Sequence, residues 1–167
     1  MDLDWLWPLL VGSGLTYGFT SLEGLRSRRH QDRRDAREKL EKALDLATTV
    51  SVEINDDQAS KRFANDAINA ASPAFWELRA IEEKLPDSRL RDAVRRATYI
   101  VTVAPAIANL GGWPDAAGSV QRAAANRLRF VLGAALRGER RLPKDHVQWL
   151  ADREHEARTA IEDAFVS

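Results

Sequence analysis

The chain has 167 residues with 25 basic and 25 acidic side chains, so its formal net charge is zero. This length fits one domain with one appendage, and the balanced charge argues against an electrostatic grip on nucleic acid along the whole chain. The absence of cysteine from the sequence excludes disulfides, thiolate metal ligands and a cysteine nucleophile.

The first predicted element is a transmembrane helix. Residues 5–22 carry no charge, and as a helix these 18 residues would span roughly 27 Å at about 1.5 Å per residue. A hydrocarbon core of about 30 Å places this run at the lower end of what can cross a bilayer. An arginine cluster follows the run, which is typical of a cytoplasmic flank. We therefore expect a single-pass protein of the inner (plasma) membrane, with its N-terminus outside and the rest of the chain in the cytoplasm.

The expected lipid contacts are two tryptophans near the outer interface and the apolar side chains that follow them. These anchor residues are Trp5, Trp7, Leu9, Leu10, Val11, Leu15, Phe19 and Leu22. The basic residues expected to set the topology and to meet lipid headgroups are Arg26, Arg28, Arg29, Arg33 and Arg34.

Two other interpretations of this run stay open. A secretory signal peptide would need a basic segment before the apolar run, whereas Asp2 and Asp4 make this one acidic. The other alternative is a buried helix or hairpin of a soluble fold, because glycine, serine and threonine dilute the apolar residues.

Within the run, Gly14 and Gly18 have the spacing that lets two helices approach closely in lipid, so they are a candidate helix–helix contact for a homo-oligomer.

A long charged helix is predicted next. Residues 26–42 hold eight basic and four acidic side chains and lack glycine and proline. Arginine, glutamate, lysine and alanine dominate this stretch, and all are good helix formers. No helix-breaking residue falls between Leu25 and Asn55, so one helix is expected to run from the membrane to about Ile54. We thus divide the chain into an anchor (1–25), a basic stem with the first bundle helix (26–54) and a helical bundle (55–167).

The remaining residues show the apolar spacing of amphipathic helices. Pro73 interrupts the second stripe, either as a kink or as the start of a new helix capped by Ser72. The uncharged stretch 97–110 is too short for a second span and contains Pro105, so we expect a helix buried on most sides. We expect an all-α fold with an antiparallel bundle of about four to five helices. The boundaries are the turns at 55–57, 86–88 and 111–115, a stop at Gly138 and a start at Pro143.

Motifs for catalysis or phosphate binding are absent from the sequence, so we expect neither an enzyme, nor a cofactor, nor a metal. Asp152 and His155 have the spacing of one half of a di-metal site, but their surroundings are charged and a solvated helix surface explains them. A second basic cluster is interpreted as an ordinary charged surface, since helical spacing scatters it over different faces. It consists of Arg122, Arg127, Arg129, Arg137, Arg140 and Arg141.

Trp113 lies in a loop with glycine and proline, where it either contacts a partner or covers one end of the bundle. The sequence favours a non-enzymatic interaction or scaffold module held at the membrane, with a protein partner whose identity is open. The alternatives are a peripheral nucleic-acid binder that uses the arginine-rich stem and a small membrane-active effector. Nucleic acid is the weaker choice, because acidic residues interrupt the stem and no aromatic residues alternate with its arginines.

Overall fold

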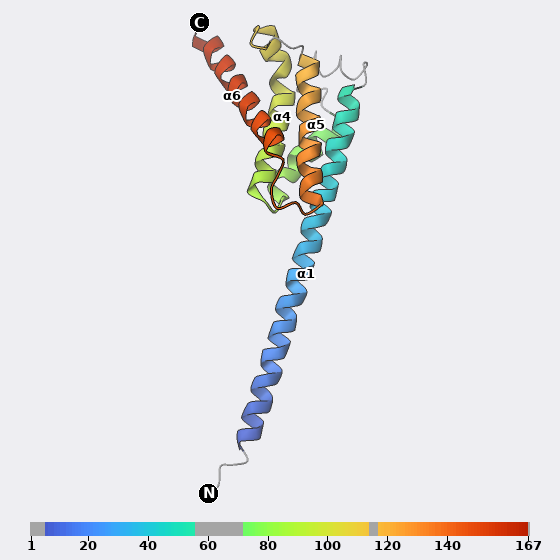
Figure 1. Cartoon of the computed structure of the whole chain (residues 1–167), viewed down its shortest axis with the longest axis vertical. Coiled ribbons are helices and arrows are strands. Elements are labelled where there is room, and N and C mark those ends of the chain that lie inside the picture. Colours follow the sequence, from blue (N-terminus) through green and yellow to red (C-terminus); the bar gives the residue numbers. More distant parts are fainter. Residues whose placement is uncertain (1–5, 56–71, 114–116, 167) are drawn as a thin grey trace. The chain divides into compact units, whose positions relative to one another are not determined.

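The computed structural model describes the backbone of residues 6–55, 72–113 and 117–166, and within the first helix the side chains of residue 28 and residues 30–55. These residues form five α-helices and one 3-10 helix, and no β-strand is present among them. The elements are α1 (Leu6–Asn55), α3 (Pro73–Ile81), η1 (Glu82–Lys84), α4 (Ser88–Asn109), α5 (Ala117–Leu136) and α6 (Lys144–Val166) (Figure 1). The all-helical class expected from the sequence is confirmed.

The chain divides into two compact units, Met1–Arg37 and Glu38–Ser167. Of the first unit, the structure describes the helical backbone of α1 from Leu6 and a few exposed side chains, among them Arg28, Arg33 and Arg34. Trp5 lies outside the described residues, as do the side chains of the other expected anchor residues, of Gly14 and Gly18, and of Arg26 and Arg29.

The expected transmembrane helix is not supported. Among the described helices, none has a stretch both long enough and apolar enough to cross a bilayer. The physical reason is visible in residues 5–22, where glycine, serine and threonine lower the mean hydropathy of the run.

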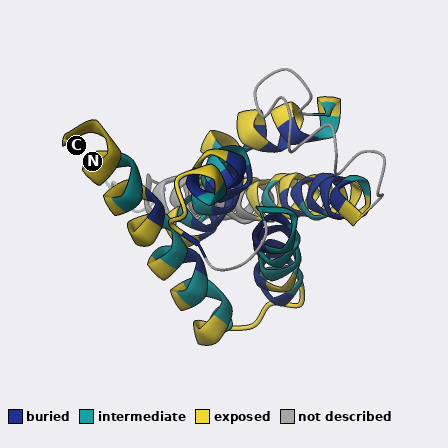
Figure 2. Ribbon diagram, turned by 90° about the horizontal axis from the view of Figure 1, so that it is seen from above, coloured by how far each residue is buried: buried dark blue, intermediate teal, exposed yellow. Residues whose placement is uncertain are grey.

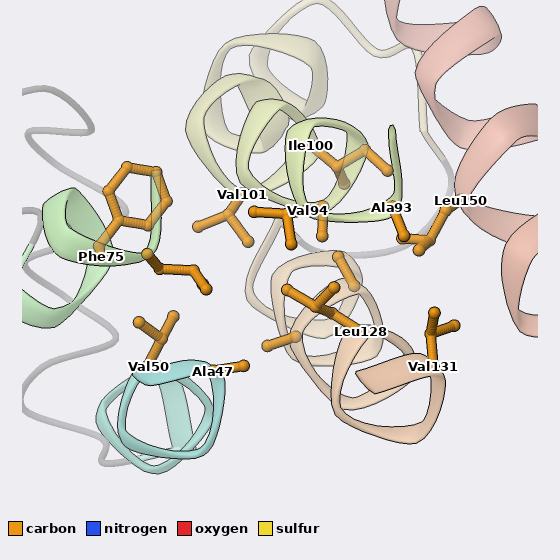
Figure 3. Packing of buried hydrophobic residues seen from close by; sticks show 14 of the residues in the cluster. Ala47, Val50, Phe75, Ala93, Val94, Ile100, Val101, Leu128, Val131 and Leu150 are labelled. Carbon is orange, nitrogen blue, oxygen red and sulfur yellow. The ribbon is translucent and has the colours of Figure 1, made fainter. Parts of the chain in front are cut away.

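The second unit is built around α4, which packs against α3, η1, α5 and α6. Its apolar residues are buried on several sides, as expected for the uncharged stretch 97–110. Buried residues lie on the inner faces of the helices and exposed residues on the outer faces (Figure 2). Figure 3 shows Ala47 and Val50 of α1 on the same side of the core as Phe75 of α3, while Leu150 of α6 points toward Ala93 of α4.

Local signals set the ends of these helices. Pro73 opens a new helix, and the Ser72 Oγ accepts a hydrogen bond from the Phe75 N–H at 3.1 Å, which settles the choice left open between a kink and a fresh start. Gly111 ends the turn after α4 with a φ of 73°, and Gly138 follows α5 with a φ of 75°. Both residues adopt the left-handed conformation that favours glycine after a helix.

Polar contacts join the helices at a few points. The Glu154 carboxylate of α6 forms ion pairs with Arg96 of α4 at 3.1 Å and with Arg158 of its own helix at 2.8 Å. The Ser51 hydroxyl of α1 donates to the Asn126 Oδ1 of α5 at 2.9 Å. These contacts fix the rotation of α6 and α1 about their axes, whereas the apolar core supplies most of the burial energy.

One buried polar contact has a backbone cause. Pro105 has no N–H, so the Val101 carbonyl one turn earlier in α4 lacks its helical partner. The Gln121 side chain of α5 supplies one, because its Nε2 donates to the Val101 oxygen at 2.8 Å. Gln121 is completely buried. A side-chain amide of α5 thereby replaces the hydrogen bond that the proline removes from α4.

This match predicts a coupling between Gln121 and Pro105. Gln121→Leu should lower the free energy of unfolding, because it leaves the buried Val101 carbonyl without a hydrogen bond. In the Pro105→Ala variant, the backbone N–H of Ala at position 105 can donate to the Val101 carbonyl. Gln121→Leu should therefore lower the free energy of unfolding by about 1 kcal/mol less in this variant than in the wild type. Urea unfolding of the wild type, both single variants and the double variant measures the coupling. Strictly additive effects would show that the amide does not compensate for the proline.

Candidate functional site

Two clefts of similar volume on the second unit are lined by arginine side chains and are candidate sites. The first, called the α5 groove below, has a volume of about 520 Å³. It is lined by Leu44, Asn126, Arg129, Phe130, Gly133 and Arg137. The second has about 500 Å³ and lies among α3, η1, α4 and α6; it is lined by Arg79, Glu82, Glu83, Arg95, Thr98, Tyr99, Thr102, Val103 and Arg158.

Charge separates the two clefts. The second holds two carboxylates beside its three arginines, so its charges largely compensate. Burial raises the pKa of Glu82, although the positive charges of Arg95 and Arg79 oppose this effect. The α5 groove is lined by two arginines and by no carboxylate among the described residues. Its lining therefore carries an excess of positive charge, which attracts anions, although Arg137 also pairs with Glu139.

The arginines of the α5 groove differ in how they are held. Arg129 forms no ion pair with a described residue, and its Nη1 donates to the Asn126 Oδ1 over 3.5 Å. Arg137 pairs with Glu139 at 2.7 Å, but both of these side chains are well exposed. An exposed pair contributes little, so its arginine can exchange one carboxylate for another at small cost. Both cations are thus available to an incoming acidic group.

An exposed aromatic ring stands between these arginines. Phe130 is 59% exposed, a high value for a large apolar side chain. One face of its ring stacks on His146 of α6, with the ring centroids 4.8 Å apart and the planes 5° from parallel. This stacking fixes the orientation of the ring, so Phe130 presents a rigid apolar surface to the groove.

The stack continues as a chain of arginine and aromatic side chains, the arginine–aromatic ladder. The Arg127 Nη1 lies 3.2 Å from the His146 Nδ1. The Arg127 guanidinium lies 4.6 Å from the centroid of Trp149, and Arg153 lies 5.6 Å from the same centroid. Each such contact contributes about 0.5–1 kcal/mol at an exposed site. The ladder holds α5 and α6 together behind the α5 groove.

Trp113 is the far end of the ladder, 6.0 Å from the Arg153 guanidinium. Its side chain is buried, with 6% exposure. The indole therefore packs against the bundle, and a partner contact at Trp113 stays a prediction. Trp76, by contrast, is 43% exposed on α3.

The sequence interpretation named the arginines of this site but missed their arrangement. Arg129, Gly133 and Arg137 are spaced four residues apart, which places them on one side of a helix. Phe130 was not singled out, because an apolar residue beside a helical stripe is usually part of the core. Asp152 and His155 belong to no group of three or more His, Cys, Asp or Glu side chains that could hold a metal ion among the described residues.

No known protein family, curated protein or solved structure matches this chain.

Gly133 gives the first test of the site. A Cβ at this position would meet only the Arg137 Nη1, at 3.3 Å, which is the far end of a flexible side chain. Glycine inside a helix costs about 0.5–1 kcal/mol relative to alanine. Gly133→Ala should therefore raise the free energy of unfolding by up to about that amount, measured by urea unfolding.

Gly112→Ala is the control, and it should change the free energy of unfolding in the opposite direction. There a Cβ would meet the Ile107 Cγ2 at 2.9 Å and the Ala160 Cβ at 3.2 Å, both in the packed interior. This variant should lose stability, by about 1–3 kcal/mol. A loss at Gly133 as large as that at Gly112 would show that the glycine of α5 has a packing role.

Proposed function

We propose that this protein is a non-enzymatic interaction module that binds an acidic segment of a partner protein in the α5 groove. The observation that carries the proposal is the combination of Arg129 and the oriented, exposed ring of Phe130 in a groove without a lining carboxylate. Arginine and aromatic side chains are the residues most enriched among those that dominate binding energy at interfaces. A groove of this kind attracts a partner by charge and holds it through apolar contact.

Nucleic acid is a second candidate, favoured by the stack of Phe130 on His146. Proteins that bind single strands combine a basic groove with aromatic rings on which bases stack. The sequence placed this alternative on the arginine-rich stem, whereas the described aromatic and basic groups are adjacent on α5 and α6. The protein partner remains the main proposal because the groove offers one exposed ring, and a strand-binding surface normally provides several.

The place of this module in the cell is also a proposal. The sequence favours the inner membrane, with residues 5–22 as the anchor and the arginine cluster on the cytoplasmic side. The modest hydropathy of α1 counts against a span and equally against the alternative of a membrane-active effector. The proposed binding surface lies wholly within the second unit, so the interaction does not depend on this anchor.

Site-specific photo-crosslinking tests the proposed function. A benzoylphenylalanine at position 130 of the full chain should give a discrete adduct with a protein in living cells. The same probe at position 76, an exposed aromatic on another helix, is the matched control and should give none. Arg129→Glu with Arg137→Glu should abolish the adduct, because like charges would then repel an acidic segment.

The crosslinking result has clear contrary outcomes. Equal adducts from positions 130 and 76, or none from position 130, would contradict a protein-binding role for the α5 groove. Adducts that carry nucleic acid instead of protein would favour the second candidate.

Cell fractionation tests the location. If residues 5–22 anchor the protein, the full chain should stay with membranes through an alkaline carbonate wash, and a chain that begins at Arg26 should be released. Recovery of the full chain in the supernatant before the wash would remove the membrane from the proposal and leave the interaction module intact.

A further inference from the structure

Gly133 is hard to explain by the fold of this chain alone. It lies within α5, outside the left-handed region, and the nearest atom to a Cβ built there is the Arg137 Nη1, the end of a flexible side chain, at 3.3 Å. A helix-interior glycine with no such reason lowers stability without compensation in the isolated chain. A small residue on a helix surface does have one clear use, which is to let a second helix approach closely.

We propose that the occupant of the α5 groove is an acidic amphipathic helix of a partner protein, which crosses α5 at Gly133. This inference rests on the proposed function and adds the conformation and charge pattern of the partner segment. Gly133 lies between Arg129 and Arg137 in the groove lining, so the point of closest approach is flanked by a cation on each side.

The spacing of the two arginines sets the pattern that the partner must carry. Their backbone positions are eight residues apart in sequence, which corresponds to about 12 Å along a helix. Two acidic residues seven or eight positions apart on one face of a partner helix span the same distance. Each could pair with one arginine while the partner backbone passes over the glycine.

Apolar residues of the groove would contact the partner helix in the space between the two ion pairs. Phe130 of α5 and Leu44 of α1 both line it, so the groove has an apolar surface contributed by two helices. A helix that docks in such a groove places apolar residues at spacings of three or four. The expected partner face therefore has leucine-like residues between two carboxylates.

A second copy of this chain fits less well as the occupant. A symmetric dimer through this face would place Arg129 and Arg137 against the same positive surface of the other copy, because a two-fold interface pairs the same patch on both subunits. Charge complementarity favours a different, acidic helix.

A synthetic peptide tests this inference on the full chain. The probe is an alanine-based helical peptide with two glutamates seven residues apart and two leucines between them on the same face. Its control is a peptide of the same composition in which the glutamates lie on opposite faces. Fluorescence anisotropy should show that the patterned peptide binds at least tenfold more tightly than the control.

Variants of the chain locate the binding. Arg129→Gln with Arg137→Gln should weaken binding of the patterned peptide at least tenfold. Arg79→Gln with Arg95→Gln removes the same charge from the other cleft and should change the affinity less than twofold. Gly133→Leu should also weaken binding about tenfold, because a bulky side chain would block the close approach. Circular dichroism and urea unfolding confirm that each variant folds.

The outcomes separate this inference from the proposed function. Equal binding of the two peptides, or binding unaffected by Gly133→Leu, would overturn the helix crossing at Gly133. If the crosslink from position 130 nevertheless forms, the interaction module stands and only the form of its partner is wrong. Tighter binding of single-stranded oligothymidylate than of either peptide would overturn the inference in favour of nucleic acid. Concentration-dependent self-association that Arg129→Gln and Arg137→Gln abolish would instead identify a second copy as the occupant.

Discussion

The burial of α4 is the constraint on which the rest of the second unit depends. This helix packs against α3, η1, α5 and α6, so each of those elements is positioned by a different side of it. A helix in that position needs a broad apolar surface, and its buried polar groups need partners inside the protein. The charged residues of α4 lie in its N-terminal half, and the buried apolar residues continue to its C-terminal half. Gln121 meets this requirement for the Val101 carbonyl that Pro105 leaves free. The register between α4 and α5 is therefore fixed by a specific polar contact as well as by shape.

That register has consequences at the surface. With one face of α5 held against α4, its opposite side presents Asn126, Arg129, Gly133 and Arg137 beside Leu44 of α1. The hydrogen bond from Ser51 to Asn126 ties α1 to the same side of α5. On the other flank, the arginine–aromatic ladder joins α5 to α6 and orients Phe130. The lining of the proposed binding surface thus comes from α1 and α5, and α6 supports it through the stack of His146 on Phe130.

The distribution of charge over the surface also depends on the tertiary structure. A net charge of zero excludes a general attraction for polyanions, yet it allows positive and negative side chains to be segregated. Arg127 and Arg129 form no ion pair with a described residue, whereas Glu154 on α6 receives two arginines. Because Arg127 and Arg129 have no ion-pair partner among the described residues, positive charge is in local excess on α5. It gives a neutral protein a surface suited to an acidic partner.

Sequence alone determined the helical class and several features of the helices, because these depend on local signals: the Asp87 cap, the uncharged stretch of α4 and the glycine after α5. It left open whether Pro73 kinks a helix or starts a new one, and only the structure shows the new helix capped by Ser72. The sequence also predicted a membrane span over residues 5–22, which the structure does not support, because no described helix is long and apolar enough to cross a bilayer. The α5 groove was decided by tertiary structure. Helical spacing puts Arg129, Gly133 and Arg137 on one face, but whether that face is buried or open depends on how α1 and α6 pack beside it. Long-range packing likewise buried Trp113 and exposed Phe130, because the neighbours of a ring, and not its position in a loop or a helix, determine its contact with water.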